Sequence, residues 1–432
     1  MSFRQHITRR SFCTQTGAFA TASTIPAWLL RTAFASQPAP APAGTPTRPD
    51  VAAIDHDRIL TAAGRYLTLT PTPLVGMVCP RSPAAAAEYY SELESASNSP
   101  VRPGSPAPFT AHRDALFTLG LAVPALAAAY SLTGESRYAE RAALHLRAWF
   151  IDPATRMVPA MDYAQTFSGP ARAPESGRDE SSAKPMTTGR YQGIIEALPL
   201  VEIAIAIPFL TTLGDSDRIG VRSWFQAYYR WLTDPHDTGP RLAALARDSK
   251  SHHASSWMLQ ASACAWLAAP TGDVGRAEDA ALSDLRHRFK TATVRAQISP
   301  DGYFPHEISS PTPYRDSLFN LDMLAAVCEL LSTRLESVWN YQLDDGASMR
   351  GAIAWHFRYM ADRGAWPYRA DIDHFEELPG RRPSLLLAAR AYQRPEYAAL
   401  WKSLKPDPPT LAILRTVPIH QPLLWTRQPP VA

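Results

Sequence analysis

The stretch of sequence that decides the fold is HRDALFTLGLAVPALAAAYSLTGESRYAERAALHLRAWF, residues 112–150. Its apolar residues recur at positions i, i+3, i+4 and i+7, which is the spacing of one face of an α-helix. Gly134 follows the first apolar run, and glycine is the residue most often found just past a helix C-terminus. The stretch therefore predicts two helices joined by a short turn at Gly134.

The same periodicity returns along most of the remaining chain. Further helices are expected at 189–214, 219–232, 254–269, 276–294, 317–333, 346–362, 383–393 and 395–404. No alternation of strands and helices competes with this pattern, so the expected fold class is all-α. The lengths and the pairing of successive helices favour an (α/α) toroid or barrel of antiparallel helix hairpins, and similarity between the pairs is too weak to indicate a sequence repeat.

The N-terminus reads as an export signal. The pair Arg9 and Arg10 is followed by a weakly apolar run and by Ala33-Phe34-Ala35, which predicts a twin-arginine signal peptide over residues 1–35. Residues 36–50 are rich in Pro and Ala and predict an extended linker, so a single helical domain is expected over 51–432. The expected location is the bacterial periplasm or the medium, and no later run of uninterrupted apolar residues predicts a membrane span.

The charge of the chain argues against a nucleic-acid partner. Residues 1–35 contain four arginines and no acidic residue, which leaves 39 Lys+Arg against 40 Asp+Glu in the remaining chain. A nearly neutral protein has no general basic field, so an anionic partner must be held by a local cluster.

The cysteines of the remaining chain are Cys79, Cys264 and Cys328. Their number is odd and their spacing is not that of metal ligands, so we expect no disulfide, no metal and no cofactor.

Two adjacent histidines stand where a helical pattern begins, in KSHHASSW at residues 250–257. An imidazole titrates near neutral pH, so His252 or His253 could accept a proton or, once protonated, hold a carboxylate. The alternative is that both histidines cap and pack the start of the helix.

A second polar cluster lies in DGYFPHEISSPTPYRDSLFNLD, residues 301–322. Tyr314 beside Arg315 could donate a proton to a leaving oxygen. The alternative is a solvated loop with an ion pair between Arg315 and Asp316, which would contribute little to stability.

Long loops at 79–110 and 152–187 are expected on one rim of the toroid, where they would build or cover a cleft.

A collinear set of segments resembles the alginate lyase family of the polysaccharide lyase family 5 type, and this chain is a divergent member. The resemblance runs from Tyr89 to Leu404 and rests on residues 111–157, DYAQ, GRYQGII, KSHHASSW, DGYFPHE, SLFNLDML, WPY and RRPSLLLAARAY. It implies an (α/α) toroid with a deep cleft and β-elimination on a uronate polymer, in which the C5 proton is removed and the oxygen at C4 leaves. No metal is implied.

The resemblance carries over to individual residues unevenly. His253 matches the family's histidine, whereas His252 stands at the family's asparagine, Ser310 at its arginine and Asp316 at its catalytic tyrosine. We expect Tyr314 and Arg315 to fill the vacant roles, which requires that they still lie in a loop, because a shift of two residues turns a helical side chain by about 200°. The expected cleft residues are Tyr163 and Gln165 of DYAQ, Arg190 of GRYQG, and Tyr90, which stands near the family's missing tryptophan pair.

Three functions remain open. The chain is expected to be an exported lyase, with His253, His252, Tyr314 and Arg315 as catalytic residues, acting as a monomer on an anionic polysaccharide or oligosaccharide. The losses at His252, Ser310 and Asp316 would also suit a protein that only binds anionic oligosaccharide. A glycoside hydrolase using Glu307 and Asp316 as acid and base is the third alternative.

Overall fold

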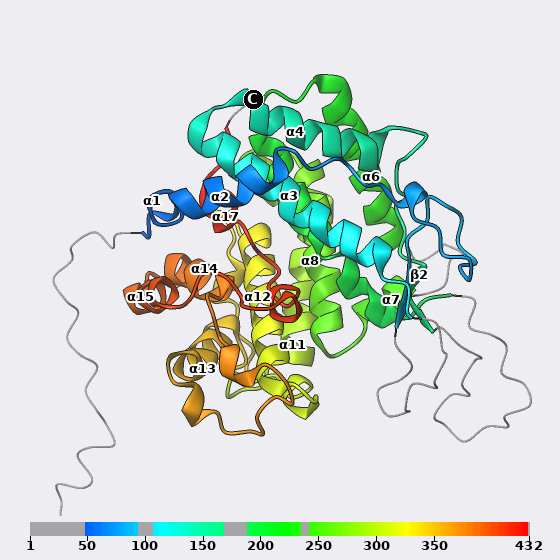
Figure 1. Ribbon diagram of the computed structural model, residues 1–432. Helices are drawn as coiled ribbons and strands as arrows, with labels where there is room; N and C mark the ends of the chain where they lie inside the picture. The colour runs from blue at the N-terminus through cyan, green and yellow to red at the C-terminus, as the bar shows by residue number, and fades with distance from the viewer. Residues whose placement is uncertain (1–47, 94–106, 168–187, 235–241, 431–432) are drawn as a thin grey trace, which may run out of the picture. The chain divides into compact units, whose positions relative to one another are not determined.

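A computed structural model describes residues 48–93, 107–167, 188–234 and 242–430 (Figure 1). The first half contains α1 (Val51–Ile54), α2 (His56–Tyr66), β1 (Tyr90–Leu93), α3 (Ala111–Thr133), α4 (Ser136–Leu146), β2 (Tyr163–Phe167), the 3₁₀ helix η4 (Tyr191–Ala197), α5 (Pro199–Ala206), α6 (Asp215–Thr233) and α7 (Leu242–Arg247). The second half contains α8 (His252–Ala268), α9 (Asp273–Glu278), α10 (Ala280–Arg288), α11 (Val294–Gln297), the 3₁₀ helix η7 (Glu307–Ser309), α12 (Pro313–Leu331), α13 (Met349–Ala361), α14 (Pro383–Tyr392), α15 (Pro395–Ser403), α16 (Leu411–Leu414) and α17 (Pro422–Thr426). The expected signal peptide and most of the linker, with part of both long loops, lie outside the described residues.

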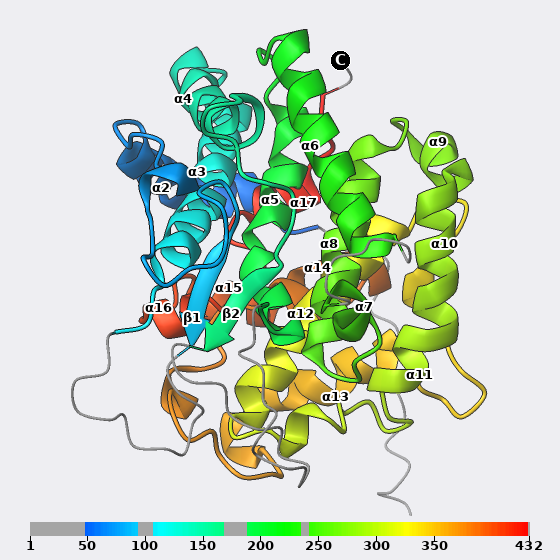
Figure 2. The ribbon, with the colours of Figure 1, turned by 90° about the vertical axis from the view of Figure 1, so that its right-hand side faces the viewer.

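Helices α3, α5, α8, α12 and α14 form the inner layer, each packing on the next. Their residues are apolar nearly all round, which is typical of helices enclosed by other helices. A second helix covers most of them from outside: α4 packs on α3, α6 and α10 pack on α8, and α15 packs on α14 (Figures 1 and 2). This confirms the all-α fold class and its toroid of antiparallel helix hairpins.

The deciding stretch forms the hairpin that it predicts. Helix α3 ends at Thr133, and Gly134 adopts the left-handed conformation, with φ of 71°, while its N–H donates to the carbonyl of Tyr130. A residue without Cβ adopts this conformation at no steric cost. Helix α4 then packs back along α3.

Prolines change two of the predicted helices. The segment expected as one helix over 189–214 is divided into η4, α5 and a 3₁₀ turn at Ile207–Phe209, because Pro199 begins α5 and Pro208 lies in the first turn of the 3₁₀ segment. Helix α12 begins at Pro313, four residues before the expected start at Ser317, since proline suits the first turn of a helix. Because of this earlier start, Tyr314 lies in a helix and not in a loop.

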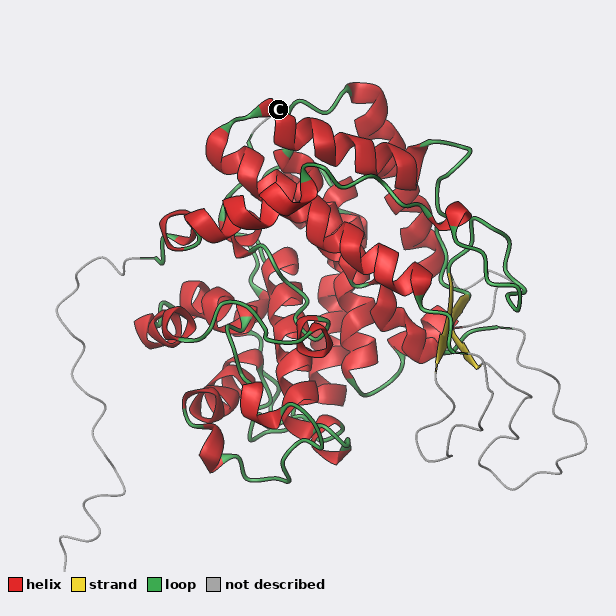
Figure 3. Cartoon of the chain, viewed as in Figure 1, coloured by secondary structure: helices red, strands yellow, loops and turns green. Residues whose placement is uncertain are grey.

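The two long loops are joined by a short parallel sheet that the sequence did not predict. Strand β1 pairs with β2 in the register of Tyr90 with Tyr163 and Leu93 with Phe167. Figure 3 shows the two strands together at one edge of the helices. The pairing brings the cleft candidates of the two loops to one place.

Two helical segments, Ala111–Thr133 and Tyr191–Phe209, are long and apolar enough to cross a membrane by length and composition. In the structure 67% and 78% of these apolar windows are buried among other helices. Their composition is therefore accounted for by their place in the inner layer.

Candidate active site

The first turn of α8 is held by a carboxylate from a distant part of the chain. The backbone N–H of His252 donates to Glu307 Oε1 at 2.6 Å, and His252 Nδ1 lies 2.8 Å from Glu307 Oε2. The first N–H groups of a helix have no partner within the helix, and a carboxylate there is also favoured by the helix dipole. Glu307, which is 1% exposed, thus caps α8 and orients the His252 ring at once.

Glu307 favours the cationic form of His252. Burial alone lowers the pKa of an imidazole, but the hydrogen bond and charge of Glu307, with the charge of Asp316, outweigh burial and raise the pKa of His252 above its ordinary value. The sign follows directly: the positive charge is present below this raised pKa and is lost as the pH rises through it.

His253 has the opposite protonation state although its ring centroid lies only 4.2 Å from that of His252. Burial, followed by the positive charges of His252 and Arg190, lowers the pKa of His253 to about 2. Its Nδ1 lies 2.9 Å from Ser251 Oγ, and the ring of Tyr191 meets it edge to face at 5.7 Å. The site therefore contains a neutral imidazole, His253, next to Arg190 and next to a second imidazole, His252, whose cationic form Glu307 favours.

Strand β2 and Gly189 place Arg190 and Tyr191 beside His253. The N–H groups of Gly189 and Arg190 donate to the carbonyls of Asp162 and Ala164 at 2.7 and 2.9 Å. A Cβ on Gly189 would lie 2.2 Å from the Ala164 carbonyl oxygen, so only glycine permits this approach. Arg190 is the one expected cleft residue whose charge acts on His253, whereas Tyr191 was not predicted, because only the fold brings its ring to the histidine.

The other expected cleft residues, Gln165, Tyr163 and Tyr90, lie in different surroundings. Gln165 is in β2 with φ of 57°, an uncommon conformation for a residue with a side chain, and it lines a cavity described below. Tyr163 is half-buried in the same strand. Tyr90 is 3% exposed and donates its hydroxyl to Glu92 Oε1 at 2.7 Å, so it supports β1 and does not present its ring to a ligand.

Tyr314 is not placed for the role expected of it, whereas the role of Arg315, whose charge acts on His252, stays a prediction. Both lie in the first turn of α12, where Tyr314 is fully buried and donates its hydroxyl to the carbonyl of Tyr359 at 2.9 Å. Arg315 donates to Asp373 Oδ1 and to Thr312 Oγ1 at 2.9 and 2.8 Å. Pro313 starts the helix too early for the loop geometry that the substitution of roles requires.

Asp316 meets the same cluster from α12. One ligand-type atom from each of His252, Glu307 and Asp316 lies within 4.8 Å of the other two, so among the described residues this group has the chemistry to hold a divalent cation, which the sequence did not predict. Both Glu307 oxygens already accept hydrogen bonds from His252. A buried carboxylate engaged in this way is a poor acid or base for glycoside hydrolysis, which also needs carboxyl groups about 5 Å or more apart.

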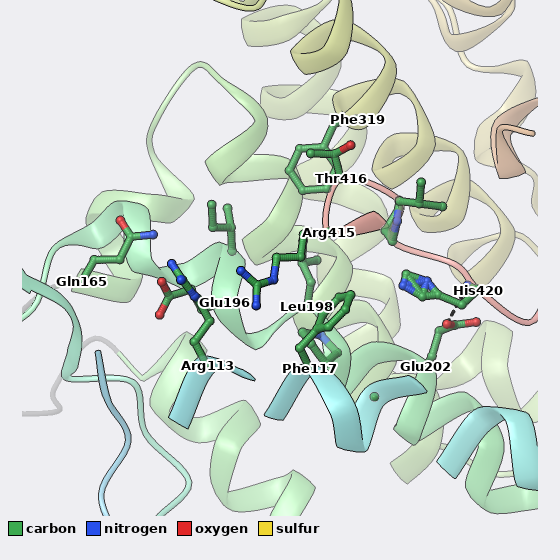
Figure 4. A pocket seen from close by; sticks show the side chains of 15 residues that line it. Arg113, Phe117, Gln165, Glu196, Leu198, Glu202, Phe319, Arg415, Thr416 and His420 are labelled. Atoms are coloured by element: carbon green, nitrogen blue, oxygen red, sulfur yellow. Dashed lines mark hydrogen bonds between the residues drawn. The ribbon is translucent and has the colours of Figure 1, made fainter. Parts of the chain in front are cut away.

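A cavity of about 200 Å³ lies next to the histidines, between α3, α5, α12 and the C-terminal segment Arg415–His420 (Figure 4). Phe319 connects the two places, because its side chain lines the cavity and its ring centroid lies 5.7 Å from that of His252. The cavity is thus one side chain away from the histidine pair.

A ring of antiparallel helices with such a polar site on its inner layer is the arrangement of a helical-toroid polysaccharide lyase. The sequence profile of the family described as alginate lyase matches residues 80–366, which is more than half of the chain. The chain therefore belongs to the alginate lyase family, as the resemblance implied, and it is a polysaccharide lyase.

One solved structure shares the fold, and a second is less similar. An alginate lyase from Bacteroides ovatus superimposes with a TM-score of 0.65 at 23% identity, covering 86% of this chain and 93% of that one. Alginate lyase A1-III from Sphingomonas species A1 gives a TM-score of 0.48 at 14% identity, covering 86% and 95%. No curated protein sequence gives a significant match.

Proposed function

We propose that this lyase cleaves an alginate-like uronate polymer by β-elimination, with His253 as the base. The observation that carries the proposal is the place of His253: its ring centroid lies 4.2 Å from that of His252 and 5.7 Å from that of Tyr191, and the charge of Arg190 acts on it. Removal of a proton next to a carboxylate places negative charge on that carboxylate, and fixed positive groups stabilise such a charge as it develops. His252 and Arg190 are the groups that would do so here.

The substrate itself would make His253 a better base. A base whose pKa is far below the operating pH has little driving force for proton abstraction. Two of the three causes of the low His253 pKa are the charges of His252 and Arg190. A uronate carboxylate bound between these cations offsets them, and the pKa of His253 rises when the substrate is in place.

In the proposed step, one proton moves from C5 of the sugar to His253, and another moves from Tyr191 to the leaving oxygen. Nδ1 of His253 donates to Ser251 Oγ, and Nε2 takes the proton from C5 of the sugar. The electron pair of the C5–H bond forms the C4=C5 double bond, and the C4–O4 bond breaks. Tyr191, whose ring meets His253 at 5.7 Å, donates its phenolic proton to the leaving oxygen. Proton transfer from the imidazolium back to the phenolate then restores both residues.

We also propose that the chain is exported by its twin-arginine leader, residues 1–35, and meets the polymer outside the cytoplasm. Fractionation of cells that express the full chain tests this: the protein should reach the periplasm or medium, and replacing Arg9 and Arg10 by Lys should keep it in the cytoplasm. Equal export of the two forms would contradict the proposal.

The reaction is tested by incubating the protein with polymannuronate, polyguluronate and other uronate polymers. β-Elimination leaves a double bond conjugated to the carboxylate, so absorbance in the near ultraviolet should rise with time. New reducing ends without this chromophore would indicate a hydrolase instead. Binding of the polymer with neither signal would indicate a protein that has kept the cleft and lost the chemistry.

A further inference from the structure

The cavity beside the histidines carries two arginines that the reaction does not use. Arg113, from the first turn of α3, and Arg415, from the C-terminal segment, both approach the same oxygen, Asp114 Oδ1. Their side chains are 28% and 27% exposed. Among the described residues, the Nε atoms of both arginines are buried and have no hydrogen-bond partner. A partly exposed guanidinium with an unused donor is well suited to receive a carboxylate.

The other titratable groups of the cavity offset the charge of its two arginines only in part. Burial raises the pKa of Glu196 above its ordinary value and that of Glu202 to about 7, so burial disfavours the charged form of both carboxyls. Burial also lowers the pKa of His420 to about 3, so this imidazole is neutral. Arg113 and Arg415 thus share one carboxylate oxygen, Asp114 Oδ1, and the balance favours an anionic ligand.

The rest of the lining suits a single sugar ring. Phe117 and Phe319 provide apolar surface on opposite sides, from α3 and α12, while Gln165 adds an amide (Figure 4). Aromatic surface packs well against the C–H face of a sugar. A volume of about 200 Å³ is smaller than the roughly 300–1,000 Å³ of pockets that enclose drug-sized ligands, so the space fits about one sugar and not a longer chain.

One side of the cavity is closed by the chain's own C-terminal segment. Glu202, from α5, accepts the N–H groups of His420 and Gln421 at 2.7 and 3.0 Å. The carbonyl of Thr416 accepts from Arg382 at 3.0 Å, and Arg415 is paired with Asp114 on α3. These bonds fix the segment as a wall between α3 and α12, and it lies beyond the residues that match the family profile.

We propose that this cavity binds the terminal sugar of a uronate chain, with Arg113 and Arg415 holding its carboxylate, so that the lyase cleaves from a chain end. The inference rests on the proposed function, because it assumes that the polymer runs from the cavity past His253. The cavity lies one side chain from the histidines, and the C-terminal segment Arg415–His420 closes it on one side. The scissile bond then lies near the end of the chain, and each cleavage releases a small product.

The products and the arginine variants test this directly. Oligomannuronates of defined length should yield one small unsaturated product from the earliest time points, while the viscosity of polymannuronate falls slowly. Arg415→Gln and Arg113→Gln should each raise KM for a tetrasaccharide roughly 10- to 100-fold, as expected for loss of a charged hydrogen bond. Arg427→Gln is the matched control, because Arg427 is exposed and donates to the Ser131 carbonyl away from the cavity. Products of every size from the outset, or KM values equal to the control, would overturn the inference.

Binding separates this inference from the proposed chemistry. A mannuronate trisaccharide titrated calorimetrically into the His253→Ala protein should bind, and adding Arg415→Gln or Arg113→Gln should weaken binding by the same roughly 10- to 100-fold. Thermal unfolding shows which of the two double variants is folded. Because each arginine is replaced separately, the test can be made if either double variant folds. Lyase activity with arginine-independent binding overturns the cavity's role alone. Arginine-dependent binding without lyase activity supports the cavity and overturns the proposed chemistry.

Discussion

The first turns of α8 and α12 have similar positions in the fold, but the polar side chains of α8 form a site and Tyr314 of α12 is buried in the core. Both begin inner helices that pack on each other, and both carry the polar side chains expected to do chemistry. In α8, the rings of His252 and His253 lie together beside Arg190 and Tyr191. In α12, Tyr314 packs against Trp366 and Phe375 in the core. A reactive residue type at a helix start therefore contributes to a site only where the fold brings it together with other polar side chains.

The largest effect is expected from His253→Ala in the α8 turn. Removal of the base should lower kcat by roughly 10²- to 10⁴-fold, the usual contribution of a positioned general base. Initial rates of ultraviolet absorbance with polymannuronate measure it. His287→Ala is the control, because His287 is an exposed histidine of α10. Activity unchanged in His253→Ala would show that the α8 turn is not the catalytic centre.

A pair of tyrosine variants compares the two regions most directly. Tyr191→Phe should lower kcat roughly 10²-fold through loss of the acid and leave the unfolding temperature nearly unchanged. Tyr314→Phe should do the reverse: it removes the hydroxyl that donates to Tyr359 and costs about 1 kcal/mol of stability, while activity stays within twofold. Calorimetric melting and initial rates measure both. The reverse outcome would restore Tyr314 to the reaction.

Glu307→Gln tests whether Glu307, which lies outside α8, maintains the positive charge of His252 in the first turn of that helix. Without the carboxylate, burial is no longer offset, so the pKa of His252 falls and its positive charge is lost at lower pH. The alkaline limb of the kcat/KM profile should move to lower pH, and each unit of displacement lowers activity about tenfold on that limb. Glu336→Gln, at a half-exposed carboxylate paired with Lys290, is the control. Identical profiles for the two variants would contradict the positioning role of Glu307.

His252→Asn introduces the residue that the family resemblance expects at this position. Asparagine can still donate a hydrogen bond to a carboxylate but carries no titrating charge. Wild-type activity should increase as the pH falls from about 8 toward 6, and the variant should lose this dependence with a change of only a few fold at neutral pH. A wild-type profile that is flat from about pH 5 to 8 would show that the His252 charge does not contribute.

The two turns also show what the sequence could and could not predict. Helical periodicity predicted α3, α4, α8 and α12, because burial of one apolar face repeats locally along the chain. The role of Tyr314 was wrong because Pro313 extends α12 towards its N-terminus, a local signal that was present and not used. Tyr191, Arg113 and Arg415 were missed for a different reason. They reach the site only through β2 pairing, helix packing and the C-terminal segment, and no local pattern encodes these contacts.

The smallest effect is expected from chelation, and it tests whether the two turns share one metal. His252, from α8, and Asp316, from α12, approach each other around Glu307 closely enough for a divalent cation. A metal would need lone pairs that are already engaged, because Glu307 accepts twice from His252, and an imidazolium has no free lone pair. Dialysis against EDTA should therefore leave kcat/KM within twofold. Loss of activity that Ca²⁺ or Zn²⁺ restores would instead make the two helix starts a single metal centre, and the contrast between them would disappear.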